Sequence, residues 1–146
     1  MIWVVDASIA VRWFIEQESH PHADLVLEKM LSQPERFAVP ELFSFEVYAV
    51  LNRLHPQGNV AFLKGMIPVL NCGILRYPMT EGLARRASVF ADRGLTGYDA
   101  CYAALAKELN GIWLTFDNKA HQLIKKNKLS HILSKNLPEN WETGSI

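Results

Sequence analysis

The chain is poor in cysteine, has no excess of either charge and contains no long apolar run. Its two cysteines, Cys72 and Cys101, have neither the spacing of a metal site nor the density of a disulfide framework, which favours a reducing compartment. No apolar segment is long enough to cross a bilayer, and the first residues lack the basic start of a signal peptide. We therefore expect a cytoplasmic protein without membrane contact.

Net charge and missing catalytic motifs narrow the possible functions further. Lys plus Arg and Asp plus Glu number 15 each, so no overall field attracts nucleic acid or membranes, and any polyanion must be drawn locally. The chain has no P-loop and no G-x-S-x-G motif, and neither cysteine lies in a nucleophile motif. Its histidines lack zinc spacing: His20, His22, His55, His121 and His131. Nucleophilic hydrolysis is therefore without support.

Length and periodicity predict a single α/β domain over residues 1–146, with the tail from about residue 137 left unassigned. Short apolar, β-branched runs predict strands over 2–5, 37–39, 73–77 and 112–116, with a further edge strand over 131–133. Between them, helical patterns cover 9–14, about ten residues ending near 31, 41–54, 60–70, 80–92 and 96–110, and a last helix follows 117. This alternation predicts a parallel sheet with helices on both faces.

Two acids follow predicted strands. Asp6 ends the first strand and Asp117 follows the fourth, at positions where α/β sheets place their ligands. Each acid taken alone is more simply read as a helix cap or turn residue. A phosphatase of the haloacid dehalogenase type needs a second Asp two residues after the first, and this chain has Ser8 there. A response-regulator receiver needs a phosphoacceptor Asp after the third strand, where this chain has Tyr77-Pro78.

Two further acids lie within predicted helices among apolar residues. Glu46 has Leu42 and Val50 four residues away on either side, and no Lys or Arg at i±3 or i±4. A carboxylate on an apolar face needs a metal or a neighbouring cation to compensate its charge. Asp99 lies in the first turn of an alanine-rich helix, where the simplest interpretation is an acid complementing the helix dipole.

Considered jointly, the four acids favour a metal site. Clustered carboxylates raise one another's pKa and stay ionised together chiefly when divalent cations lie among them. Ligation by oxygen alone selects Mg²⁺ or Mn²⁺, which keep several waters and a substrate phosphate in their shells. The chemistry this implies is phosphoryl transfer, in which a metal-activated water attacks a phosphodiester in line.

At this point the sequence resembles the PIN domain family, most closely its VapC-type toxin ribonucleases. The resemblance covers Met1 to about Leu133 and rests on four segments in order. They are V-V-D-A-S-I-A-V-R-W-F with Asp6, P-E-L-F-S-F-E-V-Y-A-V-L with Glu46, L-T-G-Y-D-A-C-Y-A-A-L-A with Asp99, and W-L-T-F-D-N-K with Asp117. Each segment alone is weak evidence, whereas the four in this order and spacing are specific.

The resemblance implies a three-layer α/β/α sandwich on a parallel, five-stranded sheet. It also implies an endoribonuclease dependent on Mg²⁺ or Mn²⁺, the toxin of a toxin–antitoxin pair, with RNA as substrate, an antitoxin protein as partner and a homodimeric state. Ser8 and Thr115 match hydroxyl positions that support a carboxylate or a metal-bound water. Many relatives carry another acid just after the fourth one, whereas here Asn118 follows Asp117, which puts a complete second metal site in question.

Two alternatives to the toxin ribonuclease stay open. A PIN-domain nuclease that processes RNA outside a toxin–antitoxin pair would have the same sequence features, and so would a non-catalytic RNA-binding or scaffold module. Retention of all four acids favours an enzyme. Leu42, Phe43 and Phe45, near the start of the helix that carries Glu46, belong either to the core or to a groove for a partner, and we expect the core.

Overall fold

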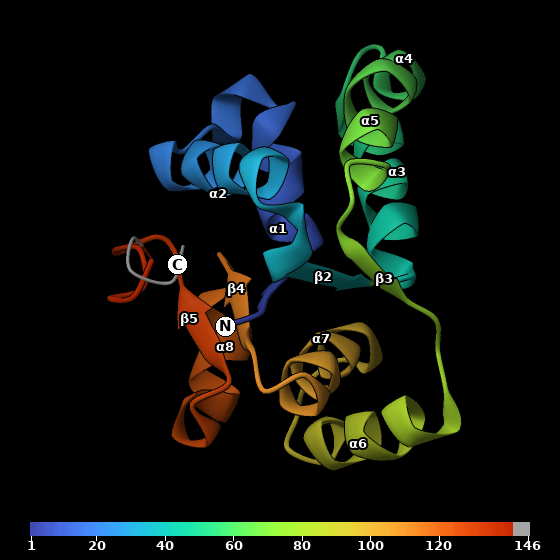
Figure 1. Ribbon diagram of the computed structural model, residues 1–146. Coiled ribbons are helices and arrows are strands. Elements are labelled where there is room, and N and C mark those ends of the chain that lie inside the picture. Colours follow the sequence, from blue (N-terminus) through green and yellow to red (C-terminus); the bar gives the residue numbers. More distant parts are fainter. Residues whose placement is uncertain (142–146) are drawn as a thin grey trace.

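The structure, a computed structural model, describes residues 1–141 and contains one five-stranded parallel sheet (Figure 1). Its strands have the order β3-β2-β1-β4-β5, and every neighbouring pair is parallel. Their bounds are β1 (Trp3–Val5), β2 (Phe37–Pro40), β3 (Leu75–Tyr77), β4 (Ile112–Thr115) and β5 (Ser130–Ile132). The five expected strands are confirmed: β1, β3 and β4 are shorter than expected, β2 is one residue longer, and β5 is shifted by one residue.

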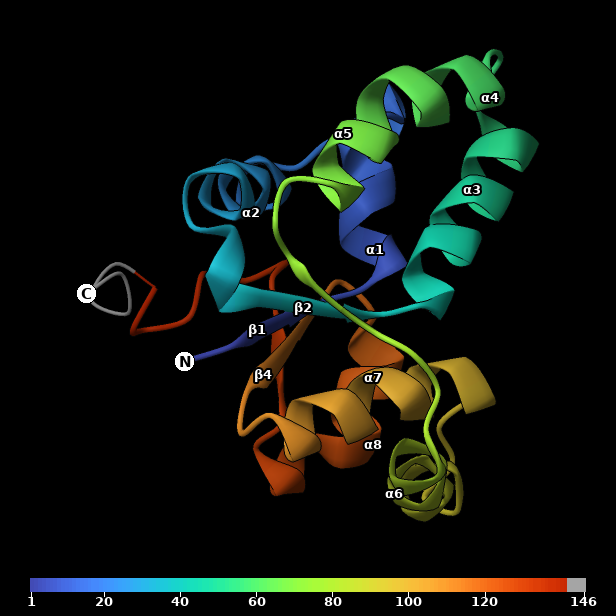
Figure 2. The same cartoon turned by 45° about the vertical axis from the view of Figure 1, so that its right-hand side comes forward.

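Helices cover both faces of this sheet, as Figures 1 and 2 show. One layer holds α1 (Ala7–Ala10), α2 (Pro21–Ser32), α3 (Leu42–Leu54), α4 (Gly58–Ala61) and α5 (Ile67–Leu70). The opposite layer holds α6 (Glu81–Ala91), α7 (Gly97–Glu108) and α8 (Asn118–Ile124). Short 3₁₀ turns lie at Val11–Trp13, Glu16–Glu18, Pro34–Arg36 and Lys125–Asn127. The predicted three-layer α/β/α sandwich is therefore confirmed.

The central strand β1 and helix α7 form the middle of the core. All three residues of β1 are buried, because helices cover both faces of the strand and leave no polar face to alternate with. Helix α7 packs on β1, β2 and β4. Its small residues allow that close approach, and four alanines on it are buried: Ala100, Ala103, Ala104 and Ala106.

The connection from α7 to β4 brings two backbones into contact. Asn110 takes a left-handed conformation with φ of 51°, which ends the helix. At Gly111, a Cβ atom would lie 2.4 Å from the carbonyl oxygen of Ile2, so only glycine fits where β4 begins beside β1. The predicted helix end at Asn110-Gly111 is thus explained by the close approach of the two strands.

The expected helix over 60–70 is present but irregular. A π-helical turn, Phe62–Met66, joins α4 to α5, and Pro68 lies at the start of α5. Proline removes one backbone donor and crowds the preceding turn, and a wider π turn just before it relieves that conflict. Pro68 therefore reshapes the helix without ending it.

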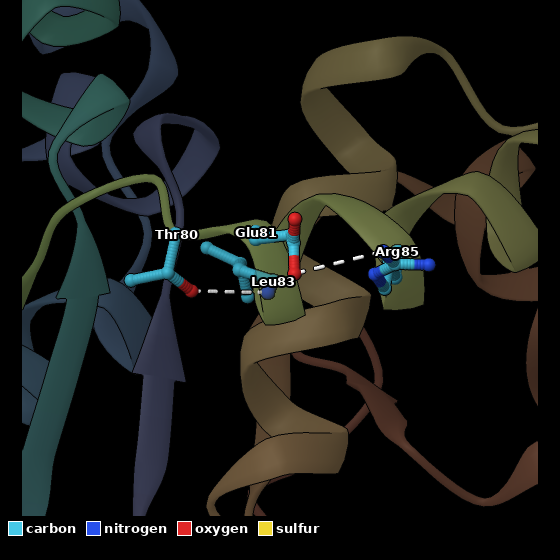
Figure 3. Close-up of polar contacts among 4 residues, drawn as sticks. All are labelled: Thr80, Glu81, Leu83 and Arg85. Carbon is cyan, nitrogen blue, oxygen red and sulfur yellow. Dashed lines mark hydrogen bonds and ion pairs between the residues drawn. The ribbon is translucent and has the colours of Figure 1, made fainter.

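Helix α6 begins and continues by local side-chain interactions, which Figure 3 shows in close-up. The Thr80 hydroxyl accepts a hydrogen bond of 3.1 Å from the backbone N–H of Leu83, which caps the helix start. Glu81 and Arg85, one turn apart, form an exposed ion pair at 3.6 Å. Exposed pairs of this kind stabilise a helix only slightly, so the burial of Leu83, Ala87 and Phe90 against the fold holds α6 in place.

Helix α3 corrects one expectation. Phe43, Val47 and Leu51, spaced four residues apart, form its buried face. Phe45 lies on the other side of the helix with its side chain 74% exposed, so its expected place in the core is wrong. Leu42 is half-buried. The helical period alone accounts for the difference, because residues 43 and 45 lie on nearly opposite sides of one turn.

The end of the described chain packs against the core. Trp141 is buried, and its ring centroid lies 5.3 Å from that of Trp3. Residues 142–146, the end of the tail left unassigned by the sequence, lie outside the described residues. Between residues 1 and 141, no helix combines the length and the apolar character needed to cross a membrane.

Candidate active site

The strand order fixes where a ligand site belongs. Strands β2 and β3 lie on one side of β1, and β4 and β5 lie on the other. The side on which successive strands are added to the sheet therefore changes between β1 and β4. In open α/β sheets, ligands bind beyond the carboxyl ends of the strands at such a point. Asp6 directly follows β1, and Thr115 and Asp117 come at and just after the end of β4. Both predicted strand-end acids therefore lie at this switch point.

Asp6 is the most buried of the four acids, with 5% of its surface exposed. It caps α1, since its Oδ1 accepts hydrogen bonds from the backbone N–H of Ser8 at 3.0 Å and from the Ser8 hydroxyl at 2.5 Å. Its Oδ2 accepts a bond of 2.8 Å from the indole Nε1 of Trp113. Burial raises the pKa of Asp6 to about 6, and these donors only partly oppose that rise.

The two hydroxyls predicted to support the site have defined roles. The Ser8 Oγ accepts a bond of 3.0 Å from the backbone N–H of Phe116, so its own proton is free to point at Asp6. The Thr115 Oγ1 accepts from the backbone N–H of Asp117 at 3.0 Å and lies 3.4 Å from the Ser8 hydroxyl. Together, Ser8 and Thr115 link the end of β1 to the end of β4.

Glu46 lies at the border of the apolar face of α3 and is half-buried. Its Oε1 accepts a hydrogen bond of 2.7 Å from the Tyr102 hydroxyl on α7. Burial raises the pKa of Glu46, and the negative charges of Asp6 and Asp99 raise it further. The ion pairs found within residues 1–141 involve none of the four acids, so no salt bridge supplies the expected counter-charge.

Asp99 and Asp117 occupy the starts of α7 and α8. Thr96 caps α7, with its hydroxyl accepting a bond of 3.1 Å from the backbone N–H of Asp99. Asp117 caps α8, with its Oδ1 accepting from the backbone N–H of Ala120 at 3.0 Å. The simple capping interpretation is thus correct for Asp117, as it is for Asp6, and it does not exclude a second role. Burial raises the pKa of Asp99, and the charge of Asp117 adds to the rise.

Electrostatic interactions link the four predicted acids through Asp99. Asp99 raises the pKa of both Asp6 and Glu46, and is itself raised by Asp117. Asp99 is therefore the common member of the cluster. An unneutralised group of this kind is repulsive, and binding a cation would relieve the repulsion.

Two positioning residues were not anticipated from the sequence. Trp113 and Tyr102 donate to Asp6 and Glu46, and their rings stack on each other with centroids 5.9 Å apart. The available signal was periodicity, since Tyr102 follows Asp99 by three residues on one helix and Trp113 precedes Thr115 by two on one strand. Asn118 is exposed, and its Oδ1 accepts a hydrogen bond of 3.3 Å from the Gln122 side-chain amide.

The cluster suits a hydrated hard cation better than a tightly ligated soft one. Within the described part of the chain, no three His, Cys, Asp or Glu side chains converge closely enough to hold one ion together. Magnesium requires less than that, because it keeps several waters and binds through one or two carboxylates plus substrate oxygens. The oxygen-only donor set and its uncompensated charge are of the kind that Mg²⁺ or Mn²⁺ prefers.

The family model described as PIN domain matches residues 3–126. The chain belongs to the PIN domain family. The match spans all four acids of the cluster and both of the hydroxyl residues that link β1 to β4. A comparison with curated protein sequences gives no significant match.

Solved structures that resemble this PIN domain include a toxin–antitoxin complex and a toxin. FitAcB from Neisseria gonorrhoeae has a TM-score of 0.69 and 15% identity, over 93% of this chain and 100% of that one. A toxin–antitoxin complex from Klebsiella pneumoniae has a TM-score of 0.59 and 17% identity, over 81% and 88%. VapC20 from Mycobacterium tuberculosis, a sarcin-ricin loop cleaving toxin, has a TM-score of 0.59 and 15% identity, over 78% and 87%. At these identities the likeness shows the fold alone.

Proposed function

We propose that this PIN domain is a Mg²⁺- or Mn²⁺-dependent endoribonuclease. The observation that carries the proposal is the cluster of Asp6, Glu46, Asp99 and Asp117 at the switch point of the sheet, with no salt bridge to any of them among residues 1–141. Carboxylates that raise one another's pKa are best explained by a cation that belongs among them.

The chain's own residues would have separate tasks in this reaction. A bound divalent cation supplies positive charge for a phosphodiester and lowers the pKa of a water for in-line attack. Asp6, Glu46, Asp99 and Asp117 would hold it. Ser8 and Thr115 keep the two strand ends in register. Trp113 and Tyr102 fix the rotamers of Asp6 and Glu46, so that the carboxylates are pre-organised before substrate arrives.

The same proposal extends to biological role and partners. The similarity to FitAcB, to a toxin–antitoxin complex and to VapC20 supports a toxin with an antitoxin protein as partner. We also propose RNA as the substrate, a homodimer as the working state and a cytoplasmic location. A PIN nuclease that processes RNA outside such a pair is the second candidate, favoured only by the four acids it would share. An antitoxin gene beside this one would decide between them.

The decisive experiment replaces Glu46 by glutamine and assays cleavage of structured RNA. Gln keeps the size of the side chain and can still accept from Tyr102, but it deletes the charge. Cleavage should fall roughly a hundredfold or more, as expected for disturbing a metal site. In the wild type, EDTA should abolish cleavage, Mg²⁺ or Mn²⁺ should restore it, and Ca²⁺, with its longer and looser coordination, should restore it poorly.

A matched control is Glu28→Gln, on an exposed position of α2. It removes the same charge by the same chemistry far from the site and should cleave as the wild type does. If Glu46→Gln cuts RNA as fast as the wild type at both limiting and saturating Mg²⁺, Glu46 has no part in metal binding and the four-acid site is wrong. Cleavage that persists in EDTA would reject the metal-dependent reaction itself.

A further inference from the structure

Three side chains stand out as exposed where burial would be expected. Among the large hydrophobic residues between 1 and 141, the most exposed are Phe45 at 74%, Tyr98 at 63% and Met79 at 59%. All three line one pocket of about 270 Å³, which also contacts Leu42 and Tyr77. Exposed single apolar residues are ordinary, but a convergence of the most exposed ones in one apolar hollow marks a binding surface.

This pocket continues into the acid cluster. A neighbouring pocket of about 360 Å³ is lined by Leu42, Phe45, Glu46, Ala49 and Tyr98, so the two aromatic residues and one of the acids share the same space. Phe45 directly precedes Glu46 on α3, and Tyr98 directly precedes Asp99 on α7. Two different helices therefore place their exposed aromatic rings in one pocket with Glu46, and each ring directly precedes one of the four acids in the sequence.

Neither ring is needed for the fold at that place. The buried face of α3 is formed by Phe43, Val47 and Leu51, and α7 is buried from Ala100 to Ala106. Helix propensity does not favour aromatics either, since they lose side-chain freedom in a helix. What an exposed flat ring offers is stacking, and every nucleobase has a face that stacks on aromatic side chains.

We propose that Phe45 and Tyr98 form a stacking site for an unpaired nucleobase next to the phosphate that is cleaved. The inference rests on the proposed ribonuclease function and adds to it how substrate is recognised. A phosphodiester placed at the four acids puts its flanking base beside these rings, because both rings line one pocket with Glu46. The site selects single-stranded or splayed-out RNA, whose bases are free to stack.

A cycle of ring and base removal tests this directly. The substrate is an oligoribonucleotide that the wild type cuts at one position, prepared intact and with the base deleted from either nucleotide flanking the cut. The enzyme variants are Phe45→Leu, Tyr98→Leu and both together, which keep the surface apolar but remove the flat rings. Losing a stacked base should lower kcat/KM of the wild type roughly 5- to 150-fold.

The expected result is non-additivity. On the intact substrate, kcat/KM of the double variant should be lower than that of the wild type by about the factor that base deletion costs the wild type. Deleting the base should not lower kcat/KM of the double variant further, because ring and base act as one pair. Tyr98→Phe, which keeps the ring, should retain wild-type kcat/KM. Tyr48→Leu is the control, since Tyr48 lies on the same helix α3 but packs against Phe62 with centroids 5.2 Å apart, and should leave the base dependence unchanged.

Other outcomes overturn the proposal. If base deletion lowers kcat/KM of the wild type and of the double variant by the same factor, the rings do not contact the base. Variants that dissociate a dimer in sedimentation, with base dependence intact, would assign the pocket to a second copy of the chain. If the wild type cleaves no RNA, the ribonuclease proposal fails on its own. The stacking site is then still tested by binding of the intact and base-deleted oligonucleotides to wild type and double variant in EDTA.

Discussion

The two ends of the sheet carry opposite charge. At the carboxyl ends of the strands lie Asp6, Asp99 and Asp117, with Glu46 beside them. At the amino ends, a hollow of about 530 Å³ touches the first residues of β1, β4 and β5, and two lysines, two histidines and one glutamate line it: Lys125, Lys128, His121, His131 and Glu139. Burial is the largest cause of the pKa shifts at both ends, and like charges add to it: the pKa values of Asp6, Glu46 and Asp99 are raised at one end and that of His121 is lowered at the other.

Helix direction explains the contrast. In a parallel sheet, each helix begins near the carboxyl end of one strand and finishes near the amino end of the next. Helix α7 accordingly has Asp99 in its first turn and Lys107 in its last, and α8 is capped by Asp117 and followed by Lys125. Acids complement the positive pole of a helix and lysines its negative pole. The same rule that stabilises single helices therefore gathers acids at one end of the sheet and cations at the other.

The largest expected effect separates the two ends by function. If the protein is a toxin, expressing it alone in a bacterial host should arrest growth, and Asp6→Ala should relieve the arrest while leaving soluble protein. Loss of the cap costs about 1 kcal/mol, which the fold can tolerate. The double change Lys125→Ala with Lys128→Ala, at the opposite end, should leave the arrest in place. Growth unaffected by an active wild-type nuclease would favour the RNA-processing alternative.

The next effect concerns stability and pH without metal. The pKa of Asp6 rises from 3.8 to about 6 on folding, so the folded chain holds this proton more tightly than the unfolded chain. The stabilisation that Asp6 contributes to the free energy of unfolding is complete below about pH 4. It is lost as the pH rises through 6, a change of about 3 kcal/mol. Urea unfolding of wild type and Asp6→Asn from pH 4 to 8 should show this loss in the wild type alone, since Asn also caps helices well.

The opposite end of the sheet should show the opposite sign. Burial lowers the pKa of His121, and the charges of His131, Lys125 and Lys135 lower it further. Because the folded chain binds this proton less tightly than the unfolded chain, the free energy of unfolding decreases as the pH falls. The difference between wild type and Asp6→Asn isolates the acid, because both proteins retain His121. Parallel stability curves for the two proteins would contradict a raised pKa at Asp6.

A smaller effect compares two buried tryptophans. Trp113→Phe keeps a ring against Tyr102 but removes the donor to Asp6, and should cost roughly 1.5–3 kcal/mol of stability at neutral pH. It should also raise the pKa of Asp6, so that the acidic limb of the cleavage profile moves to higher pH. Trp3→Phe is the matched control, because the Trp3 Nε1 is buried without a hydrogen-bond partner among residues 1–141. It should leave that limb in place.

The smallest expected effect falls on Asp99. Asp99→Asn removes a charge that raises the pKa of two neighbouring acids, so the metal-free protein should be as stable as wild type or more stable, by up to about 1 kcal/mol. If Asp99 serves only the helix dipole, the same change should destabilise by a similar amount. Thermal melting in EDTA distinguishes the two, and a clear fall in Tm would argue against the repulsive cluster.

Much of this protein could be predicted before its structure. The apolar run at β1, the alanines of α7 and the helix end at Asn110-Gly111 each have a local signature, and all three are present. The four acids could be selected because each interrupts an apolar pattern or ends a strand. The structure differs from the expectation at Phe45, which is exposed because its position on the helix opposes that of the core residue Phe43.

What the sequence determined by itself is local: which segments are strands or helices, where they end and which residues are exceptional for their surroundings. The tertiary structure decided which of those residues meet. Trp113 reaches Asp6 across 107 residues and Tyr102 reaches Glu46 across 56, contacts that periodicity cannot report. Strand order placed β1 beside β4 and so brought the ends of the two strands to one point. Hydrophobic pattern records whether a side chain is buried, whereas the identity of its partner depends on how the whole sheet is assembled.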